Sequence, residues 1–264
     1  MTTNVLPSPD LALALNLADI ADQITLERAG AADLWVDRKP DRTPVTDADL
    51  AVEDALRTAL GEQRPQDAVV GEERGVAGAD TKRCWLLDPI DGTKNFLRGV
   101  PVWATLIALV ERGSPVVGVI SAPALRRRWW AASGAGAHTR DAHGNVRTIA
   151  VSGVGELADA YLSTTHLGTW TKYRSRESYL ALVDATWENR AFGDFWQHCL
   201  VAEGAIDLAA EPIVSPWDVA AVQVLVEQAG GRFTDLEGVA RFGGGTALSS
   251  NGLLHDAAVA MLRR

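Results

Sequence analysis

The sequence predicts a layered fold that mixes α-helices and β-strands, and two observations support this prediction. Short apolar runs that suit strands alternate along the chain with longer segments that suit helices. Two of these runs, 106–110 and 116–120, are joined by Glu-Arg-Gly-Ser-Pro, which indicates a hairpin between antiparallel neighbours. Hairpins among alternating helices and strands favour a mixed layered fold over a purely parallel one.

The elements of the first half can be placed in order. A helix is expected to start at Pro9-Asp10 and run to about residue 29, because these residues suit a capped helix start. A polar, proline-punctuated loop over 37–44 leads to Thr46 or Asp47, either of which can cap a second helix to about residue 60. The strands predicted after it cover 68–70, 85–87, 106–110, 116–120 and 128–132.

The second half starts near Thr148. Its clearest element is a helix from Pro216 to about Ala229, which Gly230-Gly231 ends because glycine readily adopts the conformation that closes helices. The other elements predicted here are a helix over 193–202, strands over 160–163, 232–234 and 247–250, and a closing helix over 252–262. We therefore divide the chain into 1–147 and 148–264, two halves packed as one unit.

Composition and charge narrow the class of protein. With 47% hydrophobic and 22% charged residues, the chain resembles an ordinary globular protein. A net charge of -9 argues against nucleic acid or an anionic membrane as a partner, and an anionic ligand would need metal cations to reverse the local sign. Because the N-terminus lacks a basic start and no apolar run approaches the ~18 residues of a membrane helix, we expect a soluble cytoplasmic protein.

Other features are assigned structural roles. Cys84 and Cys199 show neither metal-ligand spacing nor a disulfide framework, so we expect reduced core residues. The run Arg126-Arg127-Arg128 is expected on a turn or a sheet edge, where cations discourage edge pairing. The five histidines show no paired ligand spacing, and most are expected to be surface or structural residues.

The most informative stretch is 88–93, Asp-Pro-Ile-Asp-Gly-Thr, which directly follows an apolar strand. Proline stiffens the link between the two acids, and glycine lets the backbone approach an anion. If a helix begins at Thr93, its free amides point at that anion, while the carboxylates would hold Mg²⁺, a hard cation that takes oxygen ligands. The alternative is a plain turn, since Asp, Pro and Gly are common turn residues.

Several acids share a position at the end of a predicted strand or the start of a predicted helix. They are Asp49, Glu72, Asp88, Asp91 and Asp218. Any one of them alone is explained as a helix cap or a solvated side chain. Together with Gly92-Thr93 they indicate a site that binds divalent metal and phosphate.

The order of these segments carries a family resemblance. Gly-Glu-Glu over 71–73, Asp-Pro-Ile-Asp-Gly-Thr-Lys-Asn-Phe over 88–96 and Pro-Trp-Asp-Val-Ala-Ala over 216–221 resemble the inositol monophosphatase-like, metal-dependent phosphatases. Val-Thr-Asp-Ala-Asp over 45–49 and Glu-Gln-Ala-Gly-Gly over 227–231 fall in the family's order as well. The resemblance covers nearly the whole chain and implies an α+β fold, a layered α/β/α/β/α sandwich.

The resemblance implies a metal ligand role for several residues. Glu72, Asp88 and the carbonyl of Ile90 look like ligands of a first Mg²⁺. Asp88, Asp91 and Asp218 look like ligands of a second, with Asp88 bridging the ions. A third, weaker ion in such enzymes leans on Glu72 and water, so two to three ions per site are expected.

The same resemblance implies which groups orient the attacking water. Thr93 and Asp49 resemble the pair that does so together with Glu72. Asp49 is preferred over Asp47, because it stands four residues before Glu53, as the family spacing requires.

The phosphate site and the two halves follow from the resemblance too. Asp91 and the amides of Gly92 and Thr93 are expected to hold phosphate oxygens. The half 1–147 would then carry most metal ligands, and the half 148–264 would carry the last ligand and the specificity segment of one catalytic unit.

That specificity segment is 193–198, Gly-Asp-Phe-Trp-Gln-His. Inositol-type members usually carry small residues there, and the pattern is similar to the histidinol-phosphate phosphatases of the family. Asp194 and Glu211 could pair with the ammonium and imidazole of histidinol phosphate, and Trp196 or Phe195 could stack on the imidazole. The alternative places both aromatic residues in the core and makes Asp194 a helix cap.

The resemblance therefore implies a Mg²⁺-dependent phosphatase that converts L-histidinol phosphate to L-histidinol and phosphate in histidine biosynthesis. An inositol monophosphatase or a broad sugar-phosphate phosphatase stays open as an alternative, and so does a catalytically silent regulatory protein. Because all the acidic positions and Thr93 are present, the silent alternative is disfavoured. A homodimer that takes a small phosphorylated metabolite is also what the family implies.

Overall fold

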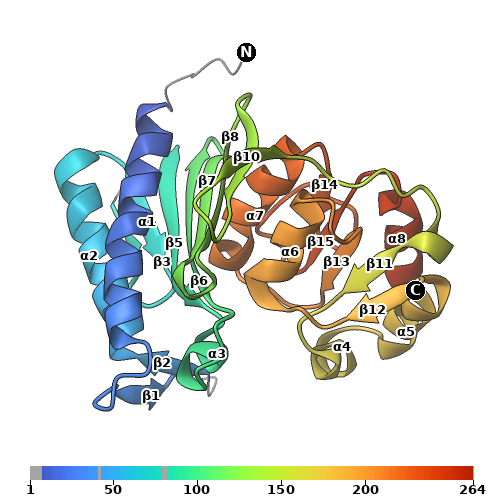
Figure 1. The fold of residues 1–264 in the computed structure, drawn as a ribbon, viewed down its shortest axis with the longest axis horizontal. Helices are drawn as coiled ribbons and strands as arrows, with labels where there is room; N and C mark the ends of the chain where they lie inside the picture. Colours follow the sequence, from blue (N-terminus) through green and yellow to red (C-terminus); the bar gives the residue numbers. More distant parts are fainter. Residues whose placement is uncertain (1–7, 41–42, 79–81, 264) are drawn as a thin grey trace.

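The computed structural model describes residues 8–40, 43–78 and 82–263. The elements form an α/β/α/β/α sandwich, which confirms the predicted fold class (Figure 1). The outer helices on the larger sheet are α1 (Pro9–Arg28) and α2 (Asp47–Gln63), and those between the sheets are α6 (Asp194–Ala202) and α7 (Pro216–Gln228). The helices beyond the smaller sheet are α4 (Leu167–Tyr173), α5 (Arg176–Ala185) and α8 (His255–Leu262).

The larger sheet has eight strands in the order β10-β9-β8-β7-β6-β5-β3-β4. They are β3 (Ala68–Gly71), β4 (Gly75–Ala77), β5 (Arg83–Asp91), β6 (Ala104–Glu111), β7 (Ser114–Ala122), β8 (Arg127–Ala132), β9 (Gly136–Arg140) and β10 (Val146–Ile149). Within the described strands, β3 and β5 form the one parallel pair of this sheet, and the other neighbours are antiparallel. The hairpins expected from the sequence are therefore present.

The smaller sheet has the order β12-β11-β13-β15-β14. Its strands are β11 (Tyr161–Ser163), β12 (Glu188–Arg190), β13 (Leu208–Glu211), β14 (Arg232–Thr234) and β15 (Ala247–Ser250). A two-stranded ribbon of β1 (Val36–Arg38) and β2 (Pro44–Thr46) lies near the short helix α3 (Thr93–Leu97), below the larger sheet in Figure 1. Short 3₁₀ turns cover Pro123–Leu125 and Leu157–Asp159.

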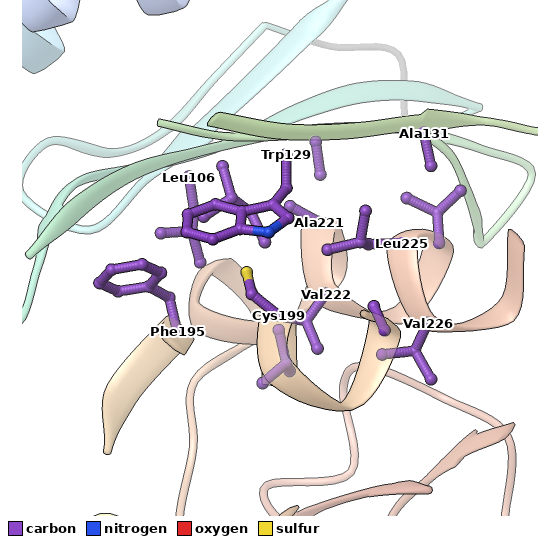
Figure 2. Close-up of a cluster of buried hydrophobic side chains, with 14 of the residues drawn as sticks. Leu106, Trp129, Ala131, Phe195, Cys199, Ala221, Val222, Leu225 and Val226 are labelled. Carbon is purple, nitrogen blue, oxygen red and sulfur yellow. The ribbon is translucent and has the colours of Figure 1, made fainter. Parts of the chain in front are cut away.

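The central core lies between the larger sheet and helices α6 and α7. Figure 2 shows Trp129 of β8 extending from the sheet toward Cys199 and Phe195 of α6, with Leu225 of α7 close by. The Trp129 and Phe195 rings lie 6.1 Å apart between centroids. This core locks the two helices that come from the second half of the chain onto the sheet of the first half.

Several sequence expectations need correction. The predicted loop over 37–44 contains β1 and the start of β2, while its residues 41 and 42 lie outside the described residues. Arg126 lies in the expected turn, but Arg127 and Arg128 lie in β8, which is flanked by β7 and β9 and is therefore not a sheet edge. Arg128 is buried, and Asp22 on α1 compensates its charge by accepting a hydrogen bond at 2.7 Å.

Other expectations hold or stay open. Cys84 and Cys199 are free thiols, as expected. The division at 147/148 falls inside β10, which pairs with β9 of the larger sheet, and the two halves stay a prediction. No helix in the described ranges has the length and apolar character needed to cross a membrane.

Helix α7 crosses β7 at Gly118, so this glycine is expected to control their packing. A Cβ at this position would lie 2.6 Å from Val224 Cγ1 and 2.7 Å from the carbonyl oxygen of Ala221. We expect Gly118→Ala to lower the free energy of unfolding by about 1–3 kcal/mol through overpacking. Gly61→Ala is the control, because Gly61 lies inside α2 with no atom within 4 Å of a Cβ. It should raise stability by about 0.5–1 kcal/mol in the same denaturant titration, and equal effects of both changes would contradict the packing argument.

Candidate active site

The parallel pair β3 and β5 brings the first two acids together. Gly71 pairs with Leu87, and the amide of Glu72 donates to the carbonyl of Leu87 at 3.2 Å. Glu72, which directly follows β3, is therefore placed beside Asp88, which lies near the carboxyl end of β5.

The segment after Asp88 is irregular, and this irregularity shapes the site. The pairing of β5 with β6 shifts register between Asp88 and Asp91. Gly92 then adopts a φ of +84°, and a Cβ there would lie 2.9 Å from the carbonyl oxygen of Val102. Helix α3 begins at the next residue, Thr93, as the sequence predicted.

Two more acids lie in the first turns of long helices. Asp49 of α2 accepts hydrogen bonds from the amide and hydroxyl of Thr46 at 2.7 and 2.6 Å, and Asp218 of α7 accepts from the amide of Ser215 at 2.8 Å. Burial raises the pKa of Asp49 to about 6 and that of Asp218 to about 7, with repulsion from Glu72 adding to both shifts. Both acids thus cap a helix and also face the acidic cluster.

Asp88 lies at the centre of this cluster. Its side chain is 1% exposed, and its Oδ1 atom has no hydrogen-bond partner among the described residues. Burial first, and then repulsion from Glu72, Asp91, Asp218 and Asp49, raise the pKa of Asp88 well above its ordinary value. Such a carboxylate is stable in its charged form only beside compensating positive charge.

Lys39 supplies one positive charge. Its Nζ atom lies 2.6 Å from Glu72 Oε1 and 2.7 Å from Glu73 Oε1. Partial burial of the ammonium opposes its charge, but the two carboxylates outweigh this effect and raise the pKa of Lys39. Burial raises the pKa of Glu73 to about 7 in spite of the bond from Lys39. Sequence reasoning missed Lys39, because it lies in a polar loop and outside the motifs that carry the resemblance.

Asp91 connects the cluster to α6. Its Oδ2 atom accepts a hydrogen bond from the amide of Phe195 at 2.6 Å, which ties the end of β5 to the first turn of that helix. Asp194, the first residue of α6, has a φ of +47° and accepts from Asn95 Nδ2 at 3.3 Å. Burial, followed by repulsion between the two carboxylates, raises the pKa of Asp91 well above its usual range. A strained non-glycine residue beside a charged cluster is typical of functional sites.

A cavity of about 170 Å³ opens next to these acids. Its lining includes Asp91, Asp194, Asp218 and Glu211 of β13. Glu211 accepts from the amide of Thr165 at 2.8 Å and from Gln197 Nε2. Burial raises the pKa of Glu211 to about 7 despite these bonds.

The structure separates the two aromatic candidates. Phe195 lines the cavity while its ring packs on Trp129 of the core. Trp196 is not among the lining residues, and its ring contacts Phe192 edge-on at 5.6 Å between centroids. Phe195 is 1% exposed and belongs to the central core, whereas Trp196 is half-buried against that core, so the alternative of a core aromatic describes Phe195 first. The two side chains point in different directions, because one residue along a helix rotates a side chain by about 100°.

The cavity also contains residues that sequence reasoning missed. Lys94, Thr165, His166 and His198 all line it. His198 is buried, its Nδ1 atom lies 2.8 Å from Ser249 Oγ, and burial lowers its pKa to about 3, so the ring is neutral. Its position four residues after Asp194, on the same face of α6, was the signal that could have indicated it.

The acidic cluster fits a hard divalent cation by its chemistry. All of its side-chain donors are oxygen atoms, and Asp88 offers a buried oxygen without a partner. In the ranges that the structure describes, no three His, Cys, Asp or Glu side chains already converge as a metal site.

A layered α+β fold with a buried acidic cluster beside a polar cavity defines the class of phosphate-ester enzymes that use hard cations. The model of the inositol monophosphatase family matches residues 7–262, and the chain belongs to this family.

Individual relatives agree with this membership. The chain is 57% identical to a histidinol-phosphatase of Mycobacterium tuberculosis, over 94% of this chain and 95% of the relative. It is 50% identical to a histidinol-phosphatase of Streptomyces coelicolor, over 94% of each. Among solved structures, an inositol monophosphatase of Thermotoga maritima superposes with a TM-score of 0.85 at 28% identity, over 96% of each chain.

Proposed function

We propose that the chain is a Mg²⁺-dependent phosphatase that hydrolyses L-histidinol phosphate to L-histidinol and phosphate. The carrying observation is the buried acidic cluster around Asp88 beside a cavity that holds two further carboxylates, Asp194 and Glu211. A site of this charge suits a phosphate ester with cationic groups once divalent cations are present. The names of the relatives that are 57% and 50% identical support the same substrate.

The cation ligands in this proposal come from both halves of the chain. Glu72, Asp88 and the carbonyl of Ile90 would hold one Mg²⁺, and Asp88, Asp91 and Asp218 would hold another. The Oδ1 atom of Asp88 has no hydrogen-bond partner among the described residues, which supports the proposed role of Asp88 as a cation ligand. The bound cations would neutralise charge on the phosphate and make a water molecule more acidic.

The groups around the phosphate have separate tasks. The amides of Gly92 and Thr93 would hold phosphate oxygens at the start of α3, and Asp91 would act on the phosphate through the cation that it holds. Asp49 and Thr93, with Glu72, would orient the attacking water. Thr93 is held in place because its hydroxyl donates to the carbonyl of Ile90 at 3.0 Å.

Substrate recognition would take place within the cavity that adjoins the acidic cluster. Asp194 and Glu211 would pair with the ammonium and imidazole of the substrate, and Phe195 would provide an apolar wall. His198 also lines the cavity, and its neutral ring would provide a polar but uncharged part of the wall. Trp196 does not line the cavity, so its contribution would be indirect, for example through its ring contact with Phe192.

We further propose that the enzyme is a cytoplasmic homodimer. The family resemblance supports this state, and size-exclusion chromatography with light scattering measures it directly. A monomer at micromolar concentration would contradict it.

Parallel assays with L-histidinol phosphate and myo-inositol 1-phosphate test the substrate. A preference of about 100-fold for the first corresponds to roughly 2.7 kcal/mol of differential transition-state binding. Preference for the inositol ester would overturn the proposed substrate but leave the metal chemistry in place. Absence of release from any phosphomonoester would favour the silent regulatory alternative.

Asp194→Asn tests the recognition of the cationic substrate. Asparagine tolerates a positive φ nearly as well as aspartate, so the backbone of Asp194 at +47° should be preserved. We expect kcat/KM for L-histidinol phosphate to fall roughly 10- to 100-fold, because a hydrogen bond to a charged group is worth about 1.5–3 kcal/mol. Hydrolysis of an aryl phosphate, whose aryl group carries no positive charge, is the control and should change much less. Equal losses on both substrates would indicate that Asp194 acts only through its contact with Asn95, because the N-cap of α6 is Gly193 and no side chain caps this helix.

A further inference from the structure

Glu53 is a buried carboxylate that has no role in the metal site or the cavity as described so far. It lies on α2, one helical turn after Asp49, and its side chain is fully buried. Its Oε2 atom accepts from the amide of Glu73 at 2.7 Å, and its Oε1 atom accepts from the amide of Arg74 at 3.1 Å. Arg57, one turn further along α2, donates to Oε1 at 2.7 Å and balances the charge.

The backbone opposite Glu53 leaves room for its carboxylate. A Cβ at Gly71 would lie 2.1 Å from Oε1 and 2.3 Å from the carboxyl carbon of Glu53. Real Cβ atoms do not approach other atoms this closely, so any side chain at position 71 has to displace Glu53. The glycine is needed here for close approach and not for an unusual backbone angle.

These contacts enclose Glu72 from both sides. Gly71 before it contacts the Glu53 carboxylate, and the amide of Glu73 after it is bound by the same carboxylate. The amide of Glu72 itself is tied to Leu87 of β5 at 3.2 Å. The direction in which the Glu72 side chain leaves the turn therefore depends on Glu53.

We propose that Glu53 is a positioning residue, which holds the turn at 71–74 so that Glu72 stays beside Asp88 for the cation. This inference rests on the proposed metal site. Because α2 also carries Asp49, the helix aligns one acid of the site through its own side chain and another through the Glu53 contacts with the turn. Residues that orient metal ligands typically change metal affinity or activity by about 10- to 100-fold when they are replaced.

Glu53→Gln tests this inference with little change in volume. The amide group would turn a donor toward a backbone N–H or toward Arg57, so at least one of the three hydrogen bonds is lost. We expect the Mg²⁺ concentration for half-maximal activity to rise about 10- to 100-fold, while kcat at saturating Mg²⁺ changes only a few-fold. Calorimetric titration of the substrate-free protein with Mn²⁺ should show the same loss of affinity.

Leu56→Ala is the matched control. Leu56 is fully buried on the same helix and contacts the core between α1, α2 and the sheet. This variant should lose about 2–5 kcal/mol of stability but keep the Mn²⁺ affinity of the parent protein. If Glu53→Gln lowers the melting temperature yet leaves Mn²⁺ affinity unchanged, Glu53 only stabilises the fold and the inference is overturned.

Gly71→Ala provides an independent second variant. Because its new methyl group would displace the Glu53 carboxylate, it should weaken Mn²⁺ binding by a similar factor. The double variant Glu53→Gln/Gly71→Ala should bind Mn²⁺ no more weakly than the single variant with the lower affinity, since both changes remove the same contact. Multiplicative losses would contradict a shared mechanism and overturn the inference.

The Mn²⁺ titration also separates this inference from the proposed function. Weakened binding in Glu53→Gln supports the positioning role whichever phosphate ester the enzyme prefers. If the parent protein itself binds no Mn²⁺, the metal assignment fails and the positioning role fails with it.

Discussion

Asp88→Asn is expected to abolish phosphatase activity while the metal-free protein becomes more stable. The change removes the one carboxylate proposed to bridge both cations, so we expect kcat to fall by more than about 10³-fold. Asparagine keeps the shape of the side chain, and it removes a charge that four neighbouring acids repel. Each kcal/mol of repulsion relieved should raise the melting temperature by roughly 2–4 °C in a chain of this size.

The opposite signs of these effects make the experiment informative. Phosphate release is measured at saturating Mg²⁺, and thermal unfolding is followed in EDTA, each beside the parent protein. Asp256→Asn is the control, because the side chain of Asp256 is 87% exposed and lies outside the cluster. It should change neither quantity. Normal turnover in Asp88→Asn would refute the metal assignment, and a lower melting temperature would refute the repulsion.

Much of the fold could be predicted because its long elements carry local signals. The start of α2 was predicted at Thr46 or Asp47, and the structure selects Thr46, whose side chain forms a capping box with Asp49. Strands with continuous apolar runs, such as β6, were found because both faces of that strand are buried. By contrast, all three residues of β1 are exposed, and β12, with the sequence Glu-Asn-Arg, lacks apolar alternation. Such strands form through pairing with distant partners, which a local pattern does not contain.

The candidate site divides along the same line. The stretch 88–93 and the acids at the helix starts are recognisable because each combines a local turn or cap with a carboxylate. Lys39 reaches Glu72 across 33 positions of sequence, and Thr165 reaches Glu211 across 46, so neither contact has a local signal. The resemblance to the family identified the acids, and only the fold revealed which neutral and basic residues surround them.

The second large effect expected is that Mg²⁺ reverses the pH dependence of the protein's thermal stability. In the metal-free protein, burial raises the pKa of Asp49 to about 6 and that of Asp218 to about 7, and it raises the pKa of Asp88 well above the usual range. Unfolded aspartates titrate near pH 4, so between about pH 4 and 7 the folded state holds protons that the unfolded state releases. Stability that is fully present below pH 4 through these groups is therefore lost as the pH rises through 7.

Mg²⁺ should act in the opposite direction, because the cation binds only deprotonated carboxylates and protons compete with it. At pH 5 we expect the Mg²⁺ concentration used at pH 8 to change the melting temperature very little, because protons occupy the carboxylates. At pH 8 a concentration of 100 times the dissociation constant should add about 2.7 kcal/mol, and the effect should disappear in Asp88→Asn. Thermal unfolding at pH 5, 6, 7 and 8, with Mg²⁺ or with EDTA, measures both slopes. Two results would contradict this prediction: a metal-free protein that becomes more stable from pH 5 to 8, or a stabilisation by Mg²⁺ that is the same at every pH. Either would show that the pKa values of these acids are not raised in the folded protein.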